Sequence, residues 1–220
     1  MVSDYFAKRG IIMTIINKLA TQLNHKDEEP NIELAHELVN TNNCEGIKEV
    51  IQNLSNKDKK IQQDCIKVAY EIGELKPELI SEYALIFIDL LKSRNNRLVW
   101  GAMTALSTIA LESSEIIIEH IETLFSAMKT GSVITIDKGV LTLAKLAAVN
   151  KQNTERIFPF LLSHLETCRP KEIPQHSEST ILAVTDDNKA ELLTVLRKRE
   201  NELTAPQLKR IKKIYKVLED

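Results

Sequence analysis

One apolar pattern recurs four times along the 220-residue chain at a constant step of 37 residues. The first copy is EGIKEVIQNL at 45–54, whose four apolar side chains share one face of a helix. The four copies are Ile47, Val50, Ile51 and Leu54; Ala84, Phe87, Ile88 and Leu91; Ile121, Leu124, Phe125 and Met128; and Phe158, Leu161, Leu162 and Leu165. Amphipathicity explains the pattern within one helix but not a register shared by four helices. The sequence therefore predicts an internal repeat.

A second helix follows each of the first three and keeps the same period. Its columns are Cys65, Ala102 and Gly139; Ile66, Met103 and Val140; Ala69, Leu106 and Leu143; and Ile72, Ile109 and Leu146. The small first column predicts a close approach between neighbouring helices. Asp58, Asn95 and Ser132 precede these helices at the same step, and each is a residue type that caps helix N-termini. The predicted unit is a pair of antiparallel helices.

These repeated columns predict the core of the protein. We expect their members to be almost fully buried, and we single out four of them. They are Leu106, Ile109, Phe125 and Leu143.

Both ends of the chain depart from the repeat. Near the start, a first-helix face recurs at a step of 35 (Ile12, Ile15, Ile16 and Leu19), and Leu34, Ala35 and Leu38 offer a short partner helix. Near the end, Pro170 and Pro174 interrupt helical continuity, so the fourth second helix is expected only over 177–184. Two more helices are predicted over 188–201 and 204–218, the latter with Pro206 in its first turn.

We expect about twelve helices, no strands and one domain over 1–220. It would comprise a divergent helical pair at 1–43, regular units at 44–168 and divergent helices at 169–220. Six Gly and six Pro are too few for the many tight turns of an all-β chain. No stretch reads as a membrane span or a signal peptide. Three scattered cysteines, Cys44, Cys65 and Cys168, indicate reduced thiols and a cytoplasmic protein.

The helical pairs and the 37-residue step resemble HEAT-repeat proteins. The second-helix sequences IQQDCIKVAYEIGEL and RLVWGAMTALSTIAL carry the resemblance, as does Pro159, where HEAT repeats often have a kinking proline. It implies an all-α, armadillo-like fold, a right-handed α-solenoid of antiparallel helix pairs whose second helices line the concave side. It also implies an interaction scaffold, since most members of this family bind other proteins.

The predicted binding surface is the concave ridge of the second helices. Its positions form two columns 37 residues apart: Gln63, Trp100 and Asp137; and Lys67, Thr104 and Leu141. Trp100 stands at the centre, in a polar column, so we expect it to be partly exposed and to contact a partner. Alternatively, the indole packs over a neighbouring helix. We interpret the chain as a scaffold for a protein or peptide, with no cofactor and no catalysis of its own.

Motifs of catalysis and metal binding are missing. The sequence has no GxGxxG, GxxxxGK[ST] or GxSxG motif. Asp137 lies near the start of its predicted helix, where the helix dipole favours a carboxylate. A catalytic role for Asp137 would need a second titratable group at hydrogen-bond distance. His164 and Cys168 share a helix face, with His176 shortly after, but neither CxxC nor HExxH spacing occurs. We therefore predict no metal site.

The C-terminal stretch 197–216 holds eight basic residues against two acidic ones. The predicted basic patch consists of Lys209, Arg210, Lys212, Lys213 and Lys216. It reads as the solvated face of a capping helix or as a contact for an acidic partner or a phosphate backbone. With 29 basic and 31 acidic residues in the chain, we expect weak binding to duplex DNA.

The alternative function is DNA binding or repair, as in the HEAT-like alkylpurine DNA glycosylases. Those enzymes carry an Asp one turn after a ridge Trp, whereas Thr104 stands one turn after Trp100. A role of the bilin-lyase kind is a third option, for which no cofactor-holding residue is visible.

Overall fold

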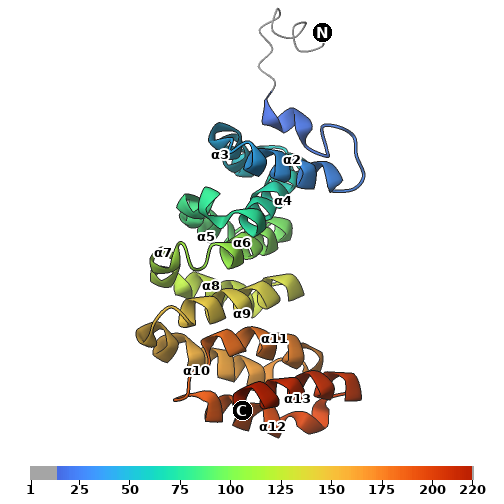
Figure 1. Ribbon diagram of the computed structural model, residues 1–220. Coiled ribbons are helices and arrows are strands. Elements are labelled where there is room, and N and C mark those ends of the chain that lie inside the picture. Colours follow the sequence, from blue (N-terminus) through green and yellow to red (C-terminus); the bar gives the residue numbers. More distant parts are fainter. Residues whose placement is uncertain (1–13, 220) are drawn as a thin grey trace, which may run out of the picture. The chain divides into compact units, whose positions relative to one another are not determined.

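The computed structural model describes residues 14–219, which form twelve α-helices and no strand (Figure 1). The helices are α2 (Glu29–Asn40), α3 (Cys44–Gln52), α4 (Lys59–Leu75), α5 (Ala84–Leu90), α6 (Asn96–Thr108), α7 (Ser114–Glu119), α8 (Ile121–Thr130), α9 (Val133–Ala147), α10 (Lys151–Thr167), α11 (Ile173–Thr180), α12 (Lys189–Lys198) and α13 (Ala205–Glu219). The predicted all-α class is confirmed.

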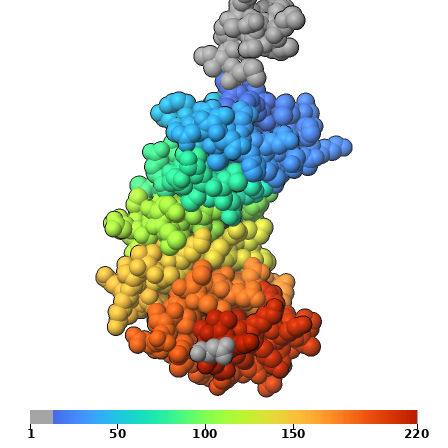
Figure 2. Space-filling view, viewed as in Figure 1, coloured from blue at the N-terminus to red at the C-terminus, as the bar shows by residue number. Residues whose placement is uncertain are grey.

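The helices gather into two compact units that meet in sequence between Tyr83 and Ala84. In the first unit, α2 and α3 both pack on α4. In the second unit, α6 packs against α9, and α9 packs in turn against α10 and α11. Figure 2 shows the helices of the second unit as closely packed bands, coloured from green to red. The division into one domain with three segments stays a prediction.

The repeated columns form the core, as predicted. The twelve second-helix positions are all buried, and Leu106, Ile109 and Leu143 have no exposed surface. Of the sixteen first-helix positions, fifteen are buried. The prediction for Phe125 is wrong, because this side chain is half-buried. Its ring stacks on Phe160 with the ring centres 4.1 Å apart, so it covers the edge of the core.

All three predicted caps are confirmed. The side-chain oxygen of Asp58 accepts a hydrogen bond from the amide of Lys60 at 2.8 Å. Asn95 accepts one from Arg97 at 3.1 Å, and Ser132 accepts one from Thr135 at 3.3 Å. Each bond satisfies an amide of the first helical turn that has no partner within the helix.

The small column also has the expected effect on helix spacing. A Cβ atom at Gly139 of α9 would lie 2.6 Å from Cγ and Sδ of Met128 in α8. The methionine would have to move to admit even a methyl group, so α8 and α9 approach closely at this glycine.

The start of the described chain differs from the predicted helical pair. Ile12 lies outside the described residues, and Ile15–Lys18 forms only the 3-10 turn η1. The helix does not continue because the amides of Ala20 and Thr21 bond to side chains instead. They donate to Oδ1 of Asn31 and to Oδ2 of Asp64, at 3.0 and 2.8 Å. The partner helix predicted from Leu34, Ala35 and Leu38 is α2, where all three are buried.

The prolines near the end play another part than expected. The helix predicted over 177–184 begins four residues earlier as α11 and ends in a 3-10 turn over Ile181–Ala183. Pro174 lies in its first turn, where a missing amide costs no hydrogen bond. Pro170 opens the short 3-10 turn Pro170–Glu172 in front of it. The two predicted C-terminal helices are α12 and α13, with boundaries shifted by one to three residues.

Candidate functional site

The first unit carries two of the predicted ridge residues, Gln63 and Lys67, on α4. Gln63 is half-buried, whereas only 9% of Lys67 is exposed. The Lys67 ammonium donates to Glu71, lies 3.9 Å from a carboxylate oxygen of Glu28 and lies over the ring of Tyr70. Burial, the largest single effect, would lower the pKa of Lys67, but the interactions with Glu71 and Tyr70 together outweigh it and raise the pKa. The ammonium group of Lys67 therefore interacts mainly with side chains of the protein itself.

The second unit carries the other four on α6 and α9. Lys145 of α9 ties the two helices together, because its ammonium donates to the carbonyl of Ser107 in α6 at 2.7 Å. Trp100 and Leu141 are half-buried, and so present part of their apolar surface to solvent. Thr104 is 5% exposed, and its hydroxyl donates to the carbonyl of Trp100 at 2.8 Å. Thr104 thus offers little surface to a partner.

Trp100 has a cationic neighbour from its own helix. The guanidinium carbon of Arg97 lies 4.3 Å from the centre of the Trp100 ring. Stacking on an aromatic ring stabilises a guanidinium and restricts its motion. Burial lowers the pKa of Arg97 from its usual value. The two side chains form a partly exposed cation–π pair on the outward face of α6, which we call the Arg97–Trp100 pair.

Asp137 contacts a histidine of a neighbouring helix. Its Oδ1 lies 2.7 Å from Nε2 of His176, a fully buried side chain of α11. Nδ1 of the same ring lies 2.9 Å from Nε2 of His164 in α10. The second titratable group that catalysis at Asp137 would require is thus present. The sequence did not reveal it, because 39 residues separate Asp137 from His176.

His164 and the nearby Cys168 are both uncharged at neutral pH. Burial, followed by the neighbouring His176, lowers the pKa of His164 to about 4. Burial raises the pKa of the nearby Cys168 thiol to about 11. A protonated thiol is a poor nucleophile, so this arrangement does not form an activated cysteine.

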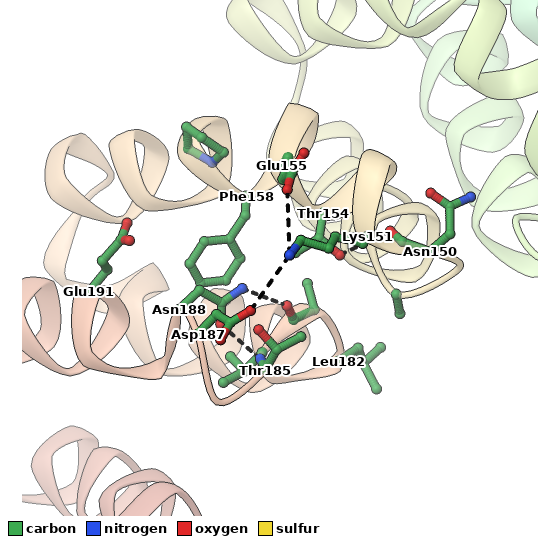
Figure 3. Close-up of a pocket in the computed structure, with 14 residues that line it drawn as sticks. Asn150, Lys151, Thr154, Glu155, Phe158, Leu182, Thr185, Asp187, Asn188 and Glu191 are labelled. Carbon is green, nitrogen blue, oxygen red and sulfur yellow. Dashed lines mark hydrogen bonds and ion pairs between the residues drawn. The ribbon is translucent and has the colours of Figure 1, made fainter.

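A separate pocket of about 520 Å³ lies in the second unit, between the start of α10 and the turn that leads into α12 (Figure 3). Phe158 contributes apolar surface, and the Lys151 ammonium lies 4.0 Å from both Glu155 and Asp187. Asn188 closes the turn by donating to the carbonyl of Ala183 at 3.1 Å. No cysteine or histidine lines this pocket. Its lining comes mainly from α10, the first helix of a predicted pair, and from residues 182–191, so the pocket lies away from the predicted ridge of second helices.

The basic patch lies on α13, opposite the buried Ile211 and Ile214. Lys209, Lys212, Lys213 and Lys216 are all exposed. Arg210 instead forms a two-pronged ion pair with Glu178 of α11, at 2.9 and 2.7 Å. The four lysines form a solvated basic face, while Arg210 joins two helices.

Among the described residues, none of the helices combines the length and apolar character that a membrane crossing requires. The sequence matches no protein-family model and no curated protein.

Solved structures do resemble the chain. An engineered protein matches with a TM-score of 0.64 and 16% identity, over 94% of this chain and 97% of its own. A designed armadillo repeat protein in complex with the peptide (KR)4 matches with a TM-score of 0.65 and 15% identity, over 90% and 95%. The karyopherin Kap121p, bound to the SUMO protease Ulp1p, matches with a TM-score of 0.63 and 14% identity, over 93% of this chain and 23% of its own. The chain is a HEAT/armadillo-type α-solenoid.

This solenoid class is the one that the HEAT resemblance implied. At 14–16% identity the likeness concerns the fold alone.

Proposed function

We propose that this solenoid is a scaffold that binds a protein or peptide partner, without catalysis of its own. Two similar solenoids support the general role, since one was solved with a peptide and the other with a protein. The surface that we propose is the outward stripe of α6 and α9 in the second unit, which we call the α6–α9 stripe. It contains the Arg97–Trp100 pair and Leu141. Gln63 and Lys67 stay predicted contacts on α4.

The Arg97–Trp100 pair is the observation that carries this proposal. Trp and Arg are the side chains most enriched among residues that dominate binding energy. They bind more strongly when they are held in place before the partner arrives, because less side-chain entropy is then lost on binding. Stacking of the guanidinium over the indole at 4.3 Å supplies that order.

The chemistry of the stripe indicates the kind of partner. Trp100 and Leu141 offer apolar surface, and Arg97 offers a guanidinium that suits a carboxylate. One oxygen of the Asp137 carboxylate is hydrogen-bonded to His176 of the neighbouring helix. We therefore expect a peptide segment with a large apolar side chain next to an acidic one. We also expect the scaffold to work in the cytoplasm, since its three cysteines are free thiols.

A displayed library of random peptides, selected on the full chain, tests the proposal. Selected peptides should combine apolar and acidic residues, and Trp100→Ala should weaken them about 30-fold, the equivalent of about 2 kcal/mol. Leu85→Ala is the matched control, because Leu85 is 51% exposed but lies on α5, a first helix. Peptides that bind the Trp100 variant as tightly as the unmodified chain would overturn the proposal.

A further inference from the structure

Four side chains with ligand or proton-accepting atoms come together in the second unit. His164 lies in α10, Cys168 directly follows that helix, His176 lies in α11 and Asp137 lies in α9. The ligand atoms of His164, Cys168 and His176 all lie within 4.8 Å of one another. We call these three residues the His–Cys cluster. Cys168 and His176 are buried, and His164 is half-buried.

The spacing within the cluster suits a zinc ion. Zinc binds histidine nitrogen at about 2.0–2.1 Å and thiolate sulfur at about 2.3 Å in a tetrahedron, so two of its nitrogens lie about 3.3 Å apart and nitrogen and sulfur about 3.6 Å. Nε2 of His164 and Nδ1 of His176 are 2.9 Å apart, so the distance between them needs to grow by only a few tenths of an ångström, while both rings turn to point at the ion. The Cys168 sulfur lies at most 4.8 Å from the histidine ligand atoms, so it needs to approach them by about 1 Å to reach the spacing of a zinc site.

The orientation of His176 is the second indication. A histidine that binds a metal through one nitrogen usually donates its other N–H to a carboxylate or a carbonyl, which fixes the ring. Here Nδ1 faces the cluster, while Nε2 lies 2.7 Å from Oδ1 of Asp137. Asp137 is thereby suited to hold His176 in the tautomer that leaves Nδ1 available to a metal.

The backbone next to Cys168 is also held. Arg199 donates through Nη1 to the carbonyls of Leu165 and Cys168, at 2.8 and 2.7 Å. The same guanidinium pairs with Glu202, so its charge is balanced nearby. Arg169 and Glu172 form a second ion pair beside the cluster. These bonds fix the end of α10, and so the position from which the Cys168 side chain projects.

We propose that the His–Cys cluster binds a zinc ion through Nε2 of His164, Sγ of Cys168 and Nδ1 of His176, with Asp137 as a positioning residue. Nitrogen and sulfur donors select zinc over calcium and magnesium, which prefer oxygen. A water molecule completes the tetrahedron on the side where His164 is partly exposed. On binding, the thiol gives one proton to solvent and becomes the thiolate ligand. His164 changes tautomer in the same step: the proton that its Nε2 donates to His176 is lost to solvent, and its Nδ1 takes up one in return, so the ring stays neutral. The ion links α10 to α11, and through Asp137 to α9.

Spacing alone did not predict this site. The ligands fall at positions 164, 168 and 176, which match neither paired-cysteine nor HExxH signatures. The 3-10 turn over Pro170–Glu172 reverses the chain between α10 and α11, and so returns His176 to the face that carries His164 and Cys168. The one early sign was the i, i+4 relation of His164 and Cys168.

Metal titration of the full chain, stripped with a chelator, tests the proposal. We expect one Zn²⁺ per chain and a raised melting temperature, since a ligand that binds only the folded state stabilises it. Co²⁺ should give the absorption bands of a tetrahedral site and a thiolate-to-cobalt charge-transfer band. Cys168→Ser should abolish that band and weaken Zn²⁺ at least 100-fold. Asp137→Asn should weaken Zn²⁺ about 10- to 100-fold while keeping the charge-transfer band.

Matched variants separate this site from others. Cys44→Ser and His120→Ala remove an exposed thiol and an exposed imidazole outside the cluster, and should change neither affinity nor spectrum. Because His176 is fully buried and its replacement can unfold the chain, His164→Ala serves as the second ligand variant. No Zn²⁺ binding by the unmodified chain would overturn the proposal. Zn²⁺ binding that is unchanged in Cys168→Ser and His164→Ala would also overturn it. The contacts among Asp137, His176 and His164 would then be hydrogen bonds only.

Discussion

Leu106→Ala gives the sharpest test of the repeat register in the second unit. Leu106 lies on α6 with no exposed surface, and it belongs to the same column as the fully buried Leu143 of α9. Removing three buried carbons costs about 2.4 kcal/mol at about 0.8 kcal/mol each. A cavity adds to this cost, because α6 is packed against α9 and cannot collapse freely. We expect a total loss of about 3–5 kcal/mol in the free energy of unfolding.

Thermal and urea unfolding measure this loss. At about 2–4 °C per kcal/mol for a chain of this size, the melting temperature should fall by about 6–20 °C. Leu85→Ala removes the same atoms from a side chain that is 51% exposed, and should stay within about 0.5 kcal/mol. A loss below about 1 kcal/mol for Leu106→Ala would place this residue outside the core and refute the 37-residue register.

Two further predictions concern thiols and lysines. In the folded, zinc-free chain at pH 8, a thiol reagent should modify only the exposed Cys44, since burial raises the pKa of Cys65 to about 12 and that of Cys168 to about 11. Mass spectrometry reports the modified sites, and rapid labelling of Cys65 would contradict its burial. Any binding to duplex DNA should be weak at physiological salt, fall as salt rises and disappear when Lys209, Lys212 and Lys213 are changed to Glu. A fluorescence-anisotropy titration measures this binding. Tight, salt-tolerant binding, or release of alkylated bases, would favour the DNA-repair alternative instead.

The fold could be predicted because its signals are local and repeated. A cap such as Asp58 or Ser132 acts within its own first turn, and a column position recurs at each unit, so both leave a mark in the sequence. Phe125 shares the register but sits half-buried against Phe160, because the pattern specifies a face of the helix and not how deep each residue lies on that face. The sequence predicts that Pro174 interrupts a helix, but Pro174 lies in the first turn of α11, where proline is tolerated.

The candidate sites were harder to predict, since they depend on contacts between helices. The pairing of Asp137 with His176 joins α9 to α11, and no spacing rule connects these positions. Lys67 and Thr104 are different, because both bond within their own helix. Glu71 follows Lys67 by four residues, and Thr104 follows its acceptor Trp100 by four. An i, i+4 inspection of the sequence would have indicated that these two polar groups are already partnered.

The central claim is that a partner binds the α6–α9 stripe at Trp100. Trp100 is the only tryptophan in the chain, so its fluorescence reports on this stripe without interference from other indoles. The most direct measurement is quenching by iodide with and without a peptide selected on the full chain. We expect measurable quenching in the free chain, because Trp100 is only half-buried, and protection with a blue shift when the peptide is bound. A tightly bound peptide that changed neither the quenching nor the emission maximum would show that the partner binds elsewhere.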